Sequence, residues 1–161
     1  MKRVLALAFA TLLLSSFQPS KKCQPLKLVS ASRTQWSGGI AEHHGTNYNL
    51  ELSSPAKYKI ELDSVWFENE GTYGLKQEGN HSRFSLQVKA KISSTNTTYE
   101  IIGGSFHDDG MRQYPDDFEK LQDVSNPFKV KGEAVVSYVF NKKKYFLAVP
   151  AFTNNPPINY P

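Results

Sequence analysis

The chain contains almost no cysteine: Cys23 is the only one in 161 residues. A single thiol cannot close an internal disulfide, so the fold must be stabilised by its buried core. Beyond residue 17 no apolar run approaches the about 20 residues of a transmembrane helix. The sequence also has no internal repeat and no coiled-coil heptad. These absences leave a compact domain without a membrane-spanning helix in its body.

The body of the chain also lacks a surplus of positive charge. The formal charge of the whole chain is +4, but Lys2, Arg3, Lys21 and Lys22 all precede Cys23. Without these four, 15 of the 19 basic residues remain, and they are matched by 15 acidic residues. Non-specific binding to nucleic acid depends on clustered Lys and Arg side chains that release phosphate counterions. We therefore expect no nucleic acid partner.

Residues 1–22 have the layout of a signal peptide and leader. Basic residues precede an apolar run from Val4 to Phe17, and small polar residues follow it. This order is typical of secretory signals. We therefore expect an exported protein of a Gram-negative cell envelope, located in the periplasm, at the outer membrane or outside the cell. Cys23 leaves a lipoprotein as an alternative, but the two lysines before it do not fit a lipidation box, and we favour an unmodified thiol.

Residues 23–161 are predicted to form a single β domain that ends in a Pro-rich tail. Successive side chains of a strand point to opposite faces, so alternating apolar and polar residues predict strands with one buried face. The alternation is strong in Tyr48–Leu52, Tyr58–Trp66, Phe84–Ile92 and Ala134–Val149. Weaker strands are expected at Leu26–Trp36 and Thr97–Phe106. Proline removes backbone donors, so the tail from Pro156 to Pro161 is expected to be extended.

About seven strands and almost no helix predict an all-β fold. One-sided strands joined by short turns form antiparallel sheets, which must cover their apolar faces by stacking or by closing. We expect an antiparallel β-sandwich of immunoglobulin-like type, with a small closed β-barrel as the alternative. The one predicted helix is Pro115–Gln122, where proline suits the first turn and acidic side chains suit the positive end of the helix dipole.

The alternation further predicts two hairpins. In the first, the strands on either side of residues 53–56 pair so that Leu50 lies opposite Ile60. In the second, a two-residue turn at residues 141–142 pairs Tyr138 with Tyr145 and keeps the apolar face continuous.

Aromatic residues make up 12% of the chain, and most of them fall on the predicted apolar faces. Phe67, Tyr73 and Phe146 are out of phase with those faces. Exposed aromatic side chains at a sheet edge can stack on sugar rings or anchor a protein partner. Burial in places where both faces of a sheet are covered is the simpler interpretation, and we favour it.

Histidine and aspartate residues offer candidate metal ligands. Neutral imidazole is a common ligand for zinc and copper, and two loops could form a site if they meet. The candidates are His43, His44, His107, Asp108 and Asp109. The irregular segment from Gly103 to Gly132 is acidic enough to suggest calcium, but its spacing does not match a known calcium loop. We favour exposed loop histidines, and so we expect no cofactor.

Catalytic motifs are missing. Ser37 and Ser105 are the nearest candidates for a nucleophile, but neither lies in a Gly-x-Ser-x-Gly motif. Glu61 and Asp63 form a carboxylate pair of the kind that glycosidases use, but the chemistry depends on a separation that sequence does not give. We expect a non-enzymatic domain that binds, or packs with, an envelope protein or polysaccharide. A metal-binding module and a hydrolase acting on envelope polymers are the alternatives.

Overall fold

The computed structural model describes residues 24–38, 43–68, 70–76, 79–81, 84–108 and 126–161. The predicted signal peptide, the predicted helix at Pro115–Gln122 and Asp109 lie outside these residues. Every regular element within them is a β-strand, which confirms the all-β fold class. Within the same residues, no helix is long and apolar enough to cross a bilayer.

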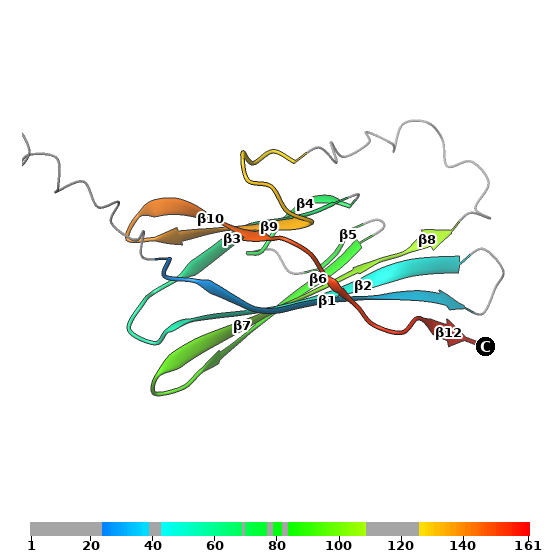
Figure 1. Ribbon diagram of the computed structural model, residues 1–161, viewed down its shortest axis with the longest axis horizontal. Coiled ribbons are helices and arrows are strands. Elements are labelled where there is room, and N and C mark those ends of the chain that lie inside the picture. The colour runs from blue at the N-terminus through cyan, green and yellow to red at the C-terminus, as the bar shows by residue number, and fades with distance from the viewer. Residues whose placement is uncertain (1–23, 39–42, 69, 77–78, 82–83, 109–125) are drawn as a thin grey trace, which may run out of the picture.

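The described strands form two open sheets (Figure 1). The larger sheet consists of β1 (Lys27–Gly38), β2 (His43–Pro55), β5 (Gly79–His81), β6 (Phe84–Ile92), β7 (Asn96–Ser105), β8 (His107–Asp108), β11 (Thr153–Asn154) and β12 (Ile158–Tyr160). The smaller sheet consists of β3 (Glu61–Phe67), β4 (Gly71–Gly74), β9 (Ala134–Phe140) and β10 (Lys143–Val149).

The strand order is β11-β1-β2-β7-β6-β5 in the larger sheet, where β12 also pairs with β1 and β8 with β2. In the smaller sheet it is β10-β9-β3-β4. Neighbouring strands are antiparallel, except that β11 and β12 run parallel to β1. The described strands therefore end at sheet edges on both sides, and the alternative of a closed barrel is wrong.

The core lies between the two sheets, which form two layers in Figure 1. Leu50 and Ile101 from the larger sheet, and Val65 and Val136 from the smaller one, are fully buried. Burial of one such side chain contributes about 1.5–3 kcal/mol. The rings of Tyr48 and Phe67 also meet across the layers, with their centroids 4.7 Å apart. Most side chains on the apolar faces predicted from the alternation thus belong to the core.

The second predicted hairpin is confirmed. β9 and β10 pair Tyr138 with Tyr145 across a two-residue turn. The turn residues Asn141 and Lys142 have positive φ angles of 49° and 62°. A left-handed conformation at both positions matches the right-handed twist of the strands that the turn joins.

The first predicted hairpin is wrong. β2 and β3 belong to different sheets, so Leu50 pairs with Ala31 and Ile101 instead of Ile60. Residues 56–60 carry the chain from the larger sheet to the smaller one. Two strands that each have one apolar face can bury those faces as neighbours in one sheet or as members of two sheets that pack face to face. Alternation alone does not distinguish these two arrangements.

A β-bulge in β3 explains the aromatic residues that were out of phase. The pairing of β3 with β9 shifts between Leu62 and Ser64, and the extra residue inverts the alternation beyond it. Phe67 therefore faces the core and is fully buried, and Tyr73 of the adjacent strand is also buried. This confirms the burial interpretation for both. Phe146 lies on the other face of the smaller sheet and is 39% exposed, so the burial interpretation is wrong for this residue.

The larger sheet extends beyond the smaller one in two places (Figure 1). At the β6–β7 hairpin, Ile92 is 77% exposed although its phase predicts burial, because the core-facing side of the hairpin tip lacks a covering layer. At the opposite end, β1, β2, β8 and β12 project past the smaller sheet. We call this second region the open end. It comprises residues 35–38, 43–46, 105–108 and 158–160.

Candidate functional site

The open end has two faces with different chemistry. Trp36 pairs with Gly45 of β2 and with Ile158 of β12, so these three residues form one cross-strand row. Ser37 pairs with His44, which in turn pairs with His107, so the next row belongs to the opposite face. The first row, and every second row along the sheet from it, lies on the outer face, which points away from the smaller sheet. The second row lies on the inner face.

Aromatic rings cover the outer face of the open end. Phe106 falls opposite Gly45 in the register of β2 with β7 and β8. Its ring stacks on Trp36, with a centroid distance of 5.8 Å and an interplanar angle of 26°. His43 contacts Phe106 edge-on at 5.3 Å, and Tyr160 contacts Trp36 edge-on at 6.3 Å.

Two glycines make room for these rings. A Cβ added at Gly45 would stand 2.7 Å from the Trp36 indole, and one added at Gly38 would stand 2.6 Å from the Tyr160 side chain. Cβ atoms in proteins essentially never approach other atoms this closely. Both rings can therefore take these positions only because the residues beneath them are glycines. Aromatic side chains thus lie across glycines on neighbouring strands, an arrangement that also protects the glycine backbone.

Three apolar side chains of the outer face are accessible to solvent. Phe106 is 40% exposed, Ile158 is 41% exposed and Tyr160 is 53% exposed. Trp36 is half-buried beneath them. We call this set, together with His43, the aromatic surface. Exposed aromatic side chains are common at binding sites because they bring a large contact area at a small cost in conformational entropy.

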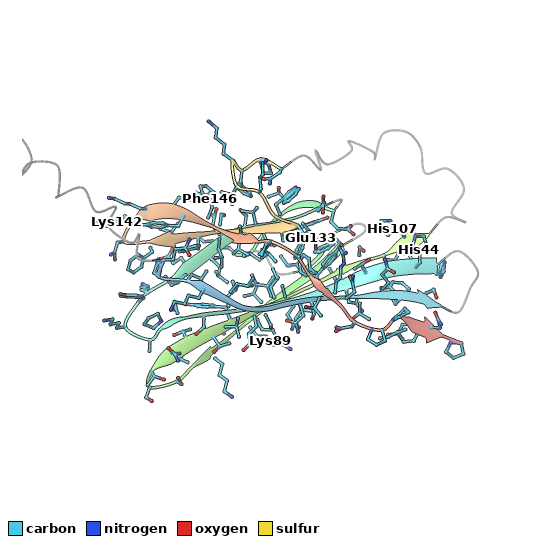
Figure 2. All side chains as sticks on the ribbon, viewed as in Figure 1. His44, Lys89, His107, Glu133, Lys142 and Phe146 are labelled. Atoms are coloured by element: carbon cyan, nitrogen blue, oxygen red, sulfur yellow. The ribbon has the colours of Figure 1, made fainter. Side chains whose placement is uncertain are left out.

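The inner face of the open end carries a histidine pair and a carboxylate. The rings of His44 and His107 stack at 5.4 Å, and Figure 2 shows both on the side of the larger sheet that faces the smaller one. The Nε2 atom of His107 lies 4.0 Å from the Oε1 atom of Glu70, which comes from the β3–β4 turn. The same carboxylate oxygen accepts a hydrogen bond of 3.3 Å from the Tyr48 hydroxyl.

Two tyrosines hold the Glu70 segment in place. Tyr73 donates a hydrogen bond of 2.7 Å to the carbonyl oxygen of Glu70. Burial, and secondarily the negative charge of Glu70, raises the pKa of Tyr73 to about 12. The same two causes raise the pKa of Tyr48 well above its ordinary value. Both hydroxyls therefore stay protonated and act as donors at neutral pH.

A hollow of about 310 Å³ lies on this part of the sheet. It is lined by Gln35, Trp36, Ser37, His44, Gly45, Thr46 and Pro157. By strand alternation, positions 35, 37, 44 and 46 of this lining belong to the inner face, and Trp36 and Gly45 belong to the outer one, so the hollow draws on residues of both faces.

The structure brings the candidate metal ligands together only in part. His44 lies beside His107, and His43 pairs in register with Asp108, but His43 belongs to the outer face. No group of three or more His, Cys, Asp or Glu side chains among the described residues has a geometry that could hold a metal ion. Asp109 lies outside those residues, so the metal site stays a prediction.

The candidate catalytic groups have structural partners. Ser37 donates a hydrogen bond of 2.8 Å to Asn159. Ser105 is buried, and its hydroxyl accepts a hydrogen bond from the backbone N–H of Thr46 at 3.0 Å. Asp63 forms a 2.8 Å ion pair with Lys144. These contacts give each group a role in the fold, and none of them orients the group as a nucleophile or an acid.

Sequence reasoning missed the aromatic surface. Trp36 and Phe106 were assigned to strands, and Tyr160 to the tail, but nothing in the alternation showed that the three would meet. Gly45 offered a usable signal, because a glycine opposite a tryptophan leaves room for the indole ring. The antiparallel pairing of β1 with β2 places Gly45 opposite Trp36. The missing information was the register of that pair.

Comparisons of the chain with protein-family models, with curated proteins and with solved structures found no match, so its own residues carry the functional argument.

Proposed function

We propose that the chain is an exported, non-enzymatic binding domain of the bacterial cell envelope, and that the aromatic surface is its contact site. The observation that carries this proposal is the set of exposed apolar side chains at the open end. Phe106, between β7 and β8, and Ile158 and Tyr160 of β12 are exposed on the same face, whereas most other large apolar side chains of the described residues are buried. A cluster of this kind on one face is typical of interaction sites.

The location rests on the N-terminal 22 residues, whose pattern is that of a secretory signal. The tail fixes the position of part of the aromatic surface. β12 is pinned to β1 by the hydrogen bond between Ser37 and Asn159, and Asn155 donates to Thr34 at 3.1 Å. The tail thus contributes Ile158 and Tyr160 to a surface of fixed shape.

We further propose that residues 23–161 form one β-sandwich of immunoglobulin-like type. In such domains one sheet has the strand order A-B-E-D and the other contains strands G, F and C, to which C′ is added in some members. The order β1-β2-β7-β6 agrees with the first sheet, and β10-β9-β3-β4 agrees with the second. The crossing of the chain between β2 and β3 fits the same scheme, since B and C belong to different sheets.

Cell fractionation tests the location. We expect the full chain, expressed with a C-terminal epitope tag in a Gram-negative host, to accumulate outside the cytoplasm without its apolar N-terminal run. The mass of the mature N-terminus also reports whether Cys23 is retained and lipidated. A full-length chain in the cytoplasm would contradict the proposal.

Sedimentation with purified envelope tests the contact site. We expect the mature protein to pellet with envelope fragments, and Phe106→Ala and Tyr160→Ala to lower the bound fraction. Phe146→Ala is the matched control, because Phe146 is 39% exposed but lies on the smaller sheet (Figure 2). Equal loss in all three variants, or no binding by the wild type, would contradict the proposed contact site.

A further inference from the structure

We infer that the outer face of the open end binds an uncharged polysaccharide. This inference rests on the proposed binding function and names the class of ligand. It depends on two features of the outer face: rings that lie against the sheet, and a strip of uncharged polar side chains that continues from them.

Trp36 and Phe106 present apolar ring faces inclined by 26° to each other, and Tyr160 borders Trp36 edge-on. Trp36 lies over Gly45 and Tyr160 over Gly38, because neither glycine has a Cβ to hold the ring away from the backbone. Phe106 continues the same layer by stacking on Trp36. The C–H groups on one side of a pyranose ring form a flat apolar patch that stacks on such faces, whereas apolar side chains of a protein partner pack best into pockets.

The strip of polar side chains begins at the next row of the outer face. Asn47 pairs there with Thr34 on one side and with Gly104 on the other, and Gly104 pairs with Ser85. One row further on, Asn49 pairs with Ser32 and Ile102, and Ile102 pairs with Gln87. The amide and hydroxyl groups of these rows offer both donors and acceptors, which is the combination that sugar hydroxyls require.

Charge is absent from these two rows. The charged row beyond them contains Lys89, Glu100 and Glu51, and Figure 2 shows Lys89 on the outer side of the sheet. Glu100 accepts a hydrogen bond of 3.2 Å from the side-chain amide of Asn49, so the neutral strip ends at this contact. Arg33 belongs to the other face, where it lies 3.6 Å from Glu133. No cationic side chain belongs to the strip and could pair with an anionic polymer, whereas a neutral polymer loses no charge hydration when it binds there.

The strip is long enough for several sugar units. Rows on one face are two residues apart, or about 7 Å along the strand. The Tyr160, Trp36, Asn47 and Asn49 rows therefore span about 20 Å. The aromatic rows would hold one end of the glycan chain by stacking, and the amide rows would orient the sugars that follow.

Titration with defined glycans tests the inference. The probes are neutral cello-, malto- and chito-oligosaccharides, with polygalacturonate as the charged comparison, and calorimetry measures binding to the mature protein. We expect at least one neutral series to bind with an affinity that rises with chain length and does not depend on salt. Phe106→Ala and Tyr160→Ala should each weaken binding about tenfold or more. Phe146→Ala should leave it unchanged.

Fluorescence gives a second readout. The chain contains two tryptophans, and Trp66 is buried, so a ligand on the aromatic surface should change the emission of Trp36. The change should disappear in Trp36→Phe. Absence of binding by every neutral glycan, binding of polygalacturonate alone, or binding that Phe106→Ala and Tyr160→Ala leave intact would overturn the inference.

The two proposals fail in different ways. If no glycan binds but sedimentation with envelope still depends on Phe106 and Tyr160, the ligand is of another class and the contact site stands. If envelope binding is also independent of both residues, the proposed contact site is wrong as well.

Discussion

The indole of Trp36 lies directly over Gly45, its cross-strand partner, at a position that a Cβ would occupy. A Cβ added there would meet the ring at 2.7 Å and would come still closer to the carbonyl oxygen of Ser105. Because that oxygen belongs to the backbone of β7, it cannot move away cheaply. We expect Gly45→Ala to lower the free energy of unfolding by about 1–3 kcal/mol and to shift the emission of Trp36. Urea denaturation and fluorescence measure the two effects.

Gly74→Ala is the matched control for this change. A Cβ at Gly74 has nothing within 4 Å, and an exposed glycine in a strand costs about 0.5–1 kcal/mol relative to alanine. We therefore expect the Gly74 variant to be as stable as the wild type or slightly more stable. A loss of stability equal to that of Gly45→Ala would show that the contact with Trp36 and the β7 backbone is not the cause.

The β9–β10 turn gives a stabilising substitution. Lys142 has a φ of 62°, a conformation that costs a residue with a Cβ about 1 kcal/mol and that glycine adopts freely. We expect Lys142→Gly, which creates an Asn-Gly turn, to raise the free energy of unfolding by up to about 1 kcal/mol. Lys143→Gly, one position into β10, should lower it, and the opposite order would contradict the assigned turn.

An apolar side chain contributes to stability only where the second sheet covers it. Its position in the apolar–polar alternation of the strand is not sufficient. Leu50 is fully buried, whereas Ile92 is 77% exposed although both occupy the core-facing phase of their strands. We expect Leu50→Ala to cost about 2–5 kcal/mol and Ile92→Ala to stay within about 0.5 kcal/mol of the wild type. Comparable losses would mean that the β6–β7 hairpin is covered in solution.

Because of Asp63, the free energy of unfolding should depend on pH in the acid range. A hydrogen bond from Lys144, supported by one from Ser137, holds the pKa of the Asp63 carboxyl below its ordinary value of 3.8. Since the folded chain binds this proton less readily than the unfolded chain does, the stabilisation is present above pH 3.8 and is lost as the pH falls through the lower, folded pKa. Asp63→Asn should reduce the slope of stability against pH in this range.

The control for that slope is Glu61→Gln. Glu61 lies 3.9 Å from Lys76 and is more exposed than Asp63, so the loss of its ion pair should change the free energy of unfolding little. If Asp63→Asn has no larger effect on the slope than Glu61→Gln, the ion pair with Lys144 does not stabilise the fold.

Alkaline pH should destabilise the segment that carries Glu70. The pKa of Tyr73 is raised to about 12 by burial and by the charge of Glu70. The stabilisation is therefore complete below pH 10 and is lost as the pH rises through about 12. Difference absorbance should show the buried tyrosines, Tyr73 and Tyr48 among them, ionising later than the exposed ones, and Tyr73→Phe should reduce the amplitude of this late phase by one tyrosine. A Tyr73 that ionises with the exposed tyrosines would contradict the packing at this turn.

Alternation predicted the strands and their buried faces because it depends only on the geometry of a single strand. It also predicted the β9–β10 hairpin, where two turn residues fix both the partner and the register. It failed for Leu50 and Ile60, because the connection at residues 56–60 allows the next strand either to pair with β2 or to cross to the other sheet, and the whole fold decides which. It failed at Trp66 and Phe67, because one extra residue at the bulge exchanges the two faces.

The candidate site was harder to predict for the same reason. His44 and His107 were named from their residue type, and their meeting depends on the pairing of β2 with β8. The aromatic surface draws on β1, β12 and the residue between β7 and β8, so three separate pairings must be known before its rings can be placed together. No local pattern in the sequence contains that information.

The most direct test of the account is the accessibility of Trp36 to acrylamide when the mature protein is bound to purified envelope. Trp66 is buried in the free protein, so quenching reports mainly on Trp36. The account predicts that binding protects Trp36 from quenching and that Tyr160→Ala weakens both the binding and the protection. Binding to the envelope with the quenching of Trp36 unchanged would contradict the assignment of the open end as the contact site.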